Sequence, residues 1–200
     1  LARDALHSEG YHVIAAYMSP VSDAYKKQGL ISAEHRLRMY KLACESSDFI
    51  MIDPWEASQS TYQRTLTILK RIESYFVDDK PQISKEFLRI MLVCGSDLLQ
   101  SFSIPGFWIP KQVRTICREY GMVCIRREGQ DVEKIISDDE ILKANRILIS
   151  VVSWSNLCNT EELVLVGDCV SRGLSIKYLT TDGVIEYIRE KQLYLNSIEK

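Results

Sequence analysis

The amino-acid sequence predicts an α/β protein built on a parallel sheet, and three observations carry that prediction. Short apolar segments that suit buried strands alternate with segments whose apolar residues recur every three or four positions. Polar side chains that could bind a ligand follow directly after several of those strands. The chain has 200 residues, a length that suits one domain, and we predict a single domain over residues 1–200.

Four apolar segments are predicted as strands, and the first of them, residues 11–18, is apolar enough to be buried on both faces of a sheet. In chain order the four are YHVIAAYM (11–18), DFIMID (48–53), LRIMLVCGSD (88–97) and MVCIRREG (122–129). Strands that alternate with helices at this spacing pair in parallel. Open parallel sheets bind ligands beyond the carboxyl ends of their strands, so the loops after these four segments are the places to look for a site.

The predicted helices fill the intervals between the strands. Ser32 is a candidate cap for the second of them, and Pro110 and Gly121 mark the start and end of another. The helical segments are 1–10, 32–46, 60–76, 110–121, 131–144 and 180–194. Because no cap precedes Leu1, we expect this first helix to continue from sequence upstream.

Composition excludes several classes of protein. The net charge of −2 and the pI near 6.0 argue against a general nucleic-acid binder, which carries a basic excess. Apolar runs such as IMLVC fall far short of the roughly 18–20 residues of a membrane span, and no signal-peptide pattern is present. We therefore expect neither nucleic acid nor a membrane as partner, and a cytoplasmic and/or nuclear location.

Cysteine spacing argues against a metal site. The six cysteines are scattered without a C-x-x-C pair, and the chain has three histidines. Neither a zinc site nor a disulfide scaffold has this spacing. We expect buried, reduced thiols and no protein-bound metal.

Two loops in the first half of the chain carry candidate ligand-binding residues. Lys26 and Lys27 follow the first strand, where a lysine can reach a phosphate as a point charge, although such a pair is also typical of a solvated loop. After the second strand, Tyr62 and Thr65 can stack on a ring and bond an amide. Tyr62 could equally be half-exposed packing.

The loops after the third and fourth strands carry further candidates. Gly95 permits close approach of the backbone to a ligand, and Asp97 can accept hydrogen bonds from sugar hydroxyls or only cap the next helix. Phe107 and Trp108 could be a platform on which a ligand ring stacks, or they could only pack at the surface. Arg127 can meet a phosphate or carboxylate, or only form a surface ion pair with Glu128 or Glu133.

A set of motifs resembles one enzyme family. The stretches are SPVSDAYKKQGLISAEHR, DPWEASQSTYQRTL, LVCGSDLLQSF, PGFWIP, GMVCIRREGQD and LSIKYLTTDGVIEYIREKQLY. Together they resemble the nicotinamide/nicotinate mononucleotide adenylyltransferases of eukaryotes, in a plant-like form. The likeness covers about residues 1–145 and 168–195, and it implies the Rossmann-like, three-layer α/β/α fold of the nucleotidyltransferase superfamily.

The resemblance implies a reaction in NAD biosynthesis. Family members join ATP to nicotinamide or nicotinate mononucleotide, releasing pyrophosphate and forming NAD or deamido-NAD. The mononucleotide phosphate attacks the α-phosphorus of ATP in line, so the protein contributes positioning and charge neutralisation. Mg²⁺ or another divalent cation accompanies ATP, and homo-oligomers are common in the family.

The resemblance also implies roles for eight residues. Lys27 matches a lysine near the mononucleotide phosphate, and Tyr62 stands where relatives place a tryptophan that stacks on the nicotinamide ring. Gly95 and Asp97 match the glycine and the ribose-binding aspartate. The remaining matches are Thr65 and Trp108 in the pyridine pocket, Phe107 beside Trp108, and Arg127 as a basic residue near the pyridine nucleotide.

The sequence departs from the family at both of its ATP signatures, so no catalytic residue is assigned. The pattern G-x-F-x-P-x-(H/T)-x-x-H would lie before Leu1, and with it the first strand, which is central in the family sheet, is missing. I-S-S-T-x-x-R would precede Asp168, where Gly167 takes the place of its arginine. We regard residues 146–167 as an atypical segment in which ELVLVG (162–167) has strand propensity.

Two alternatives to an active adenylyltransferase remain from the sequence. An inactive isoform would keep only a pyridine-mononucleotide half-site, and would bind that ligand without ATP turnover. The second alternative is a nucleotidyltransferase for another substrate, such as pantetheine phosphate. The set of pyridine-pocket residues, Tyr62, Thr65 and Trp108, argues against it.

Overall fold

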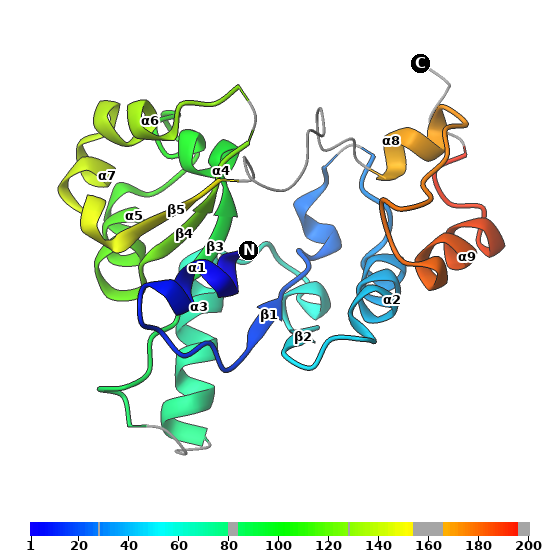
Figure 1. The fold of residues 1–200 in the computed structure, drawn as a ribbon. Coiled ribbons are helices and arrows are strands. Elements are labelled where there is room, and N and C mark those ends of the chain that lie inside the picture. Colours follow the sequence, from blue (N-terminus) through cyan, green and yellow to red (C-terminus); the bar gives the residue numbers. More distant parts are fainter. Residues whose placement is uncertain (28, 80–83, 128, 154–165, 196–200) are drawn as a thin grey trace. The chain divides into compact units, whose positions relative to one another are not determined.

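The computed structural model describes residues 1–27, 29–79, 84–127, 129–153 and 166–195 (Figure 1). The chain divides into two compact units. Unit 1 comprises residues 1–13 and 64–161, and unit 2 comprises residues 14–63 and 162–200. The single domain over 1–200 remains a prediction.

Unit 1 contains a parallel three-stranded sheet. Its strands are β3 (Leu92–Gly95), β4 (Met122–Ile125) and β5 (Ile149–Val152), in the order β3-β4-β5. The pairing is parallel throughout, which confirms the predicted class of sheet. β5 lies inside the segment 146–167, and sequence reasoning missed it because four residues directly after a helical pattern show no clear period.

Helices pack against this sheet, as Figure 1 shows for the elements from α4 (Ser96–Ser101) to α7 (Glu140–Ala144). Asp131 and Asp139 each accept hydrogen bonds from the first turn of a following helix, so the predicted helix 131–144 is in fact two helices, α6 and α7. The helical elements of unit 1 are α1 (Ala2–Ser8), α3 (Thr65–Ser74), the π-turn η3 (Tyr75–Asp79), α4 (Ser96–Ser101), α5 (Pro110–Thr115), the π-turn η4 (Ile116–Tyr120), α6 (Val132–Asp138), α7 (Glu140–Ala144) and the 3₁₀ turn η5 (Arg146–Leu148).

The core of unit 1 lies on one face of the sheet. Register pairs Met122 with Leu92 on one side and with Ile149 on the other, so these side chains share a face. The helices cover that face with fully buried apolar side chains, Leu99, Ile116, Val132 and Leu142. A sheet edge backed by such a core is a rigid base for the loops that follow its strands.

The cysteines of the described residues are free thiols. Cys94, Cys117, Cys124 and Cys169 are buried, and Cys44 is half-buried. Burial raises the pKa of the Cys117 thiol to about 11. These side chains therefore pack as small hydrophobic groups, as the sequence predicted.

Unit 2 contains a parallel pair of short strands and a helical layer. The strands are β1 (Ala16–Met18) and β2 (Ile50–Ile52). The predicted strand 11–18 forms only in its last three residues, and residues 11–13 belong to unit 1. The helices are η1 (Asp23–Tyr25), α2 (Ala33–Cys44), η2 (Glu56–Ser58), α8 (Val166–Ser171) and α9 (Asp182–Glu190).

α2 and α9 pack together to form the core of unit 2. Met39 and Leu42 of α2 pack against the buried side chains of Val184 and Ile188 on α9. The Nδ1 atom of His35 and the hydroxyl of Tyr187 join the two helices by a hydrogen bond of 2.8 Å. Ser32 caps α2 through His35, as predicted.

The segment 162–167, which has strand propensity in the sequence, is not described as a strand. Val166 and Gly167, the end of the stretch with strand propensity, lie in α8, and residues 162–165 lie outside the described part of the chain. In the part of the chain that the structure describes, the strands form two parallel sheets, β1-β2 and β3-β4-β5. Among the described residues, no helix combines the length and apolar character that crossing a bilayer requires.

Candidate functional site

The carboxyl end of β3 carries a carboxylate paired with an arginine. Asp97 lies in the first turn of α4, and the Oδ1 atom of Asp97 is 3.1 Å from the Nε atom of Arg127, which follows β4. Both side chains are about half exposed, at 52% and 51%. The N-cap residue of α4 is Gly95, and the interaction found for the Asp97 side chain is this ion pair with Arg127.

Of the two acidic residues expected as surface ion-pair partners of Arg127, Glu133 pairs with another arginine. Glu133 forms its ion pair with Arg146, at 2.8 Å, and Glu128 lies outside the described residues. The pairing with Asp97 instead brings Arg127 to the end of β3. The half-exposed carboxylate can accept hydrogen bonds from hydroxyl groups, and the guanidinium can donate to an anion.

At Gly95 the neighbouring side chains occupy the space that a Cβ atom would need, whereas the backbone conformation is open to any residue. The φ of Gly95 is −82°. A Cβ atom at this position would overlap the Oδ1 atom of Asp97 and lie 3.1 Å from the Nε atom of Arg127. The absence of a side chain at Gly95 therefore makes room for the Asp97–Arg127 pair.

Ser96 joins the ends of β3 and β4, and sequence reasoning missed it. The Ser96 side chain is fully buried, and its Oγ atom accepts a hydrogen bond of 3.0 Å from the backbone N–H of Arg127. This bond fixes the backbone from which the Arg127 side chain extends. In the sequence, Ser96 is simply a small residue between Gly95 and Asp97, so nothing there signals the contact.

The aromatic loop places its two rings differently. The indole Nε1–H of Trp108 donates to the Oγ atom of Ser101 at 2.9 Å, and the Trp108 ring meets Phe102 edge-on with centroids 4.7 Å apart. Phe107 is 66% exposed. Trp108 is half-buried and held at two points, which makes it the better candidate for stacking on a ligand ring.

Thr65 is the first residue of α3. Within the part of the chain that the structure describes, no side chain caps this end of the helix. The backbone N–H groups of Thr67 and Ile68 in the first turn donate to the carbonyl of Arg64, at 2.8 and 3.3 Å, so these donors are not left for a ligand amide or carboxylate. Thr65 offers a hydroxyl at this end of the helix.

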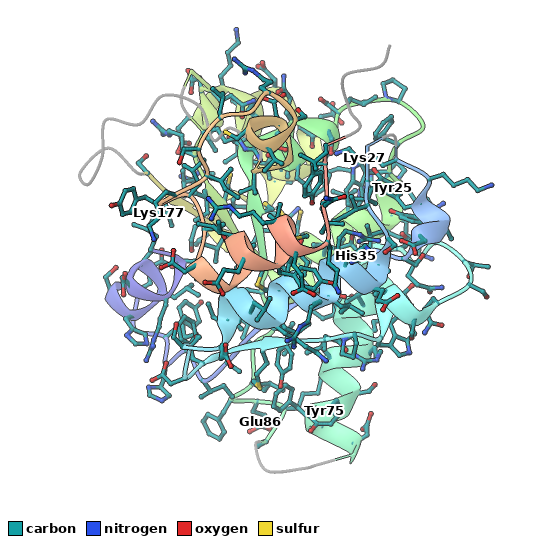
Figure 2. The ribbon with its side chains drawn as sticks, turned by 90° about the vertical axis from the view of Figure 1, so that its right-hand side faces the viewer. Tyr25, Lys27, His35, Tyr75, Glu86 and Lys177 are labelled. Atoms are coloured by element: carbon teal, nitrogen blue, oxygen red, sulfur yellow. The ribbon has the colours of Figure 1, made fainter. Side chains whose placement is uncertain are left out.

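The loop that carries Lys27 in unit 2 is held by a buried arginine. Arg36 of α2 is 6% exposed and donates three hydrogen bonds: to the carbonyl of Val21 at 2.6 Å, to the carbonyl of Ile31 at 2.9 Å and to Asp23 at 2.8 Å. These contacts lie on both sides of Lys27, which is itself exposed on the loop (Figure 2). Sequence analysis missed Arg36, since its burial depends on the loop folding back over α2.

Tyr62 stacks on a second tyrosine from the lysine loop. The rings of Tyr62 and Tyr25 lie 5.6 Å apart at 26° to each other, and they are 48% and 45% exposed. Tyr25 directly precedes Lys26 and Lys27, so the stack brings Tyr62 to the cationic loop. The stack therefore places an exposed aromatic face next to a positively charged loop.

Two buried acids follow the strands of unit 2 and were also missed. Asp53 and Glu56 are each 6% exposed, and the hydroxyl of Ser19 donates to Glu56 at 2.9 Å. Burial raises the pKa of the Glu56 carboxyl. Among the described residues, no group of three or more His, Cys, Asp or Glu side chains could hold a metal ion.

The eight predicted residues thus fall into two sets. Gly95, Asp97 and Arg127 are in mutual contact in unit 1, where Trp108 is fixed to the same helix that carries Asp97. Unit 1 also holds Thr65 and Phe107, whereas Lys27 and Tyr62 belong to unit 2.

Comparison with known proteins agrees with the resemblance noted in the sequence. Residues 1–169 match the family model described as cytidylyltransferase-like. The chain is 59% identical to the nicotinamide/nicotinic acid mononucleotide adenylyltransferase of Arabidopsis thaliana, over 97% of this chain and 81% of that protein. It is 51% identical to the enzyme of that name from Oryza sativa subsp. japonica, over 97% of this chain and 77% of the relative. For adenylyltransferase 1 of Bos taurus the identity is 32%, over the whole chain and 83% of the relative.

Proposed function

The chain belongs to the nicotinamide/nicotinic acid mononucleotide adenylyltransferases, within the cytidylyltransferase-like family, and from this premise we propose its reaction. It transfers the adenylyl group of ATP to nicotinamide or nicotinate mononucleotide. The products are NAD or deamido-NAD and pyrophosphate, so the reaction belongs to NAD biosynthesis. The observation that carries the proposal is 59% identity over 97% of the chain.

The residues at the strand ends are proposed to bind the mononucleotide. In unit 1, Trp108 offers a half-buried aromatic ring that can stack on the pyridine ring, with Phe107 next to it in the chain and Thr65 to bond the amide or carboxylate. Tyr62, in unit 2, is proposed as a stacking residue from the family resemblance. Asp97 can accept hydrogen bonds from the ribose hydroxyls. The cations are proposed to neutralise phosphate charge or a carboxylate: Lys27 on its loop and Arg127 beside Asp97.

The chemistry needs no protein nucleophile. The mononucleotide phosphate attacks the α-phosphorus of ATP, so the chain accelerates the reaction by fixing the two substrates and neutralising negative charge. Mg²⁺ is proposed to accompany ATP and to reduce the charge repulsion between the phosphates. Phosphate oxygens are the hard ligands that Mg²⁺ prefers, so we expect ATP to supply most of its ligands.

The direct test is the reaction itself. The purified chain is incubated with nicotinamide mononucleotide, ATP and MgCl₂, and NAD is measured by enzymatic cycling, with omission of ATP and addition of EDTA as controls. NAD above background that requires both ATP and the metal is the expected result. A folded sample that binds the mononucleotide without forming NAD would contradict the proposed transfer.

Substitution of Tyr62 tests the stacking role. Tyr62→Ala is expected to raise the KM for nicotinamide mononucleotide about tenfold, because stacking on an aromatic side chain contributes roughly 1–3 kcal/mol. Tyr62→Trp keeps an aromatic face and is expected to stay within about threefold of the unchanged chain. Steady-state kinetics with ATP saturating gives the comparison.

A matched control is available on η3. Tyr75, labelled in Figure 2, is 39% exposed, and Tyr75→Ala removes a tyrosine of similar exposure from outside both sets of site residues. Its KM for the mononucleotide is expected to be unchanged. Equal effects of the two alanine substitutions would show that Tyr62 contributes only packing.

A further inference from the structure

We propose that Ser101 is a positioning residue for the pyridine end of the mononucleotide, acting through the indole of Trp108. The inference rests on the proposed function, because it assigns to Trp108 the ring of that substrate. Ser101 was not singled out by the sequence. What points to it is a chain of two hydrogen bonds at the end of α4.

The direction of both hydrogen bonds is fixed by their chemistry. The Ser101 hydroxyl donates its one proton to the carbonyl of Leu98, at 2.6 Å. Its oxygen is therefore an acceptor toward Trp108, and the indole Nε1–H, which can only donate, bonds it at 2.9 Å. Neither bond can reverse, so Ser101 holds the indole N–H in one direction.

A second contact fixes the plane of the indole. Phe102, the residue after Ser101, is 9% exposed and meets the Trp108 ring at 84° with centroids 4.7 Å apart. An edge-on aromatic pair resists tilting of the ring, and the hydrogen bond resists rotation of the ring in its own plane. With both contacts in place, the half-buried Trp108 keeps a defined part of its surface exposed.

The helix connects this ring to the proposed ribose site. Asp97 and Ser101 are four residues apart in α4 and so lie on the same face of the helix, one turn apart. Leu99, which is fully buried, anchors the helix in the core. The ribose and the pyridine ring are adjoining parts of the mononucleotide, and one rigid turn of helix thus sets the spacing between the groups proposed to bind them.

The first test compares two serines at the same end of the helix. Ser101→Ala is expected to raise the KM for nicotinamide mononucleotide about fivefold to tenfold, with the KM for ATP within about twofold. Ser101→Thr keeps the hydroxyl and is expected to restore most of the affinity. Ser103→Ala is the control: the Ser103 hydroxyl also donates to a carbonyl three residues back, at 2.8 Å, but accepts nothing from Trp108.

A double-mutant cycle shows whether Ser101 acts through the indole. Trp108→Phe keeps an aromatic ring and removes the N–H donor. Once that donor is gone, Ser101→Ala is expected to add less than about twofold to the KM for the mononucleotide. Additive effects of the two substitutions would overturn the proposal, because they would mean that Ser101 acts independently of Trp108.

A spectroscopic readout separates this inference from the proposed function. Trp108 is one of three tryptophans, so its indole ¹H–¹⁵N signal can be assigned by substitution. Ser101→Ala is expected to move that signal without any substrate, and titration with nicotinamide mononucleotide then gives an affinity without turnover. Absence of NAD formation would contradict the proposed function alone. An unchanged affinity in Ser101→Ala would overturn the positioning role.

Discussion

Replacing Gly95 with alanine is expected to lower kcat/KM for nicotinamide mononucleotide about 100-fold, the scale of losing a charge-assisted hydrogen bond in a binding site. The added methyl group would overlap the Oδ1 atom of Asp97 and crowd the Nε atom of Arg127, at 3.1 Å. Both are ends of side chains and can move aside. We expect this displacement of Asp97 to separate its carboxylate from Arg127, whereas the fold of unit 1 is expected to change little.

The Gly95 variant needs a control for the general effect of alanine. A Cβ atom at Gly183, in α9, meets only Leu42 at 3.6 Å, an ordinary contact. Gly183→Ala is expected to leave the kinetics unchanged and to stabilise the helix by roughly 0.5–1 kcal/mol. If Gly95→Ala kept its kcat/KM at an unchanged melting temperature, the proposed role of the Asp97–Arg127 pair in binding would be wrong.

Replacing Arg36 with methionine is expected to be the most destabilising of these substitutions, at about 2–4 kcal/mol in the free energy of unfolding, because two backbone carbonyls lose their donor. Methionine fills much of the space but donates no hydrogen bond. The carbonyls of Val21 and Ile31 and the carboxylate of Asp23 then lose their common donor. Because Lys27 lies between those anchors, the KM for the mononucleotide is expected to rise in the fraction that folds.

A second arginine on the same helix gives the matched control. Arg38 is exposed, and Arg38→Met is expected to change the free energy of unfolding by less than about 0.5 kcal/mol. Urea unfolding followed by circular dichroism measures both variants. Equal stability of the two would mean that the buried guanidinium does not hold the lysine loop.

Local pattern was enough to find most of the elements and the ends of the strands. The spacing of apolar residues located α3, and Ser32 located the start of α2. The local pattern did not reveal short elements such as β5, because four residues do not establish a period. Strand ends are also where Gly95, Asp97 and Arg127 were nominated, since parallel strands end at a common edge.

Sequence by itself therefore determined the α/β class, the parallel strands and the family. These depend on local periodicity and on motifs of consecutive residues, both of which are visible in the sequence alone. Only the tertiary structure decided which side chains meet: Asp97 with Arg127, Ser101 with Trp108, and Arg36 with both sides of the lysine loop. Such contacts depend on strand register and on how loops fold back, which bring together atoms that no local pattern relates.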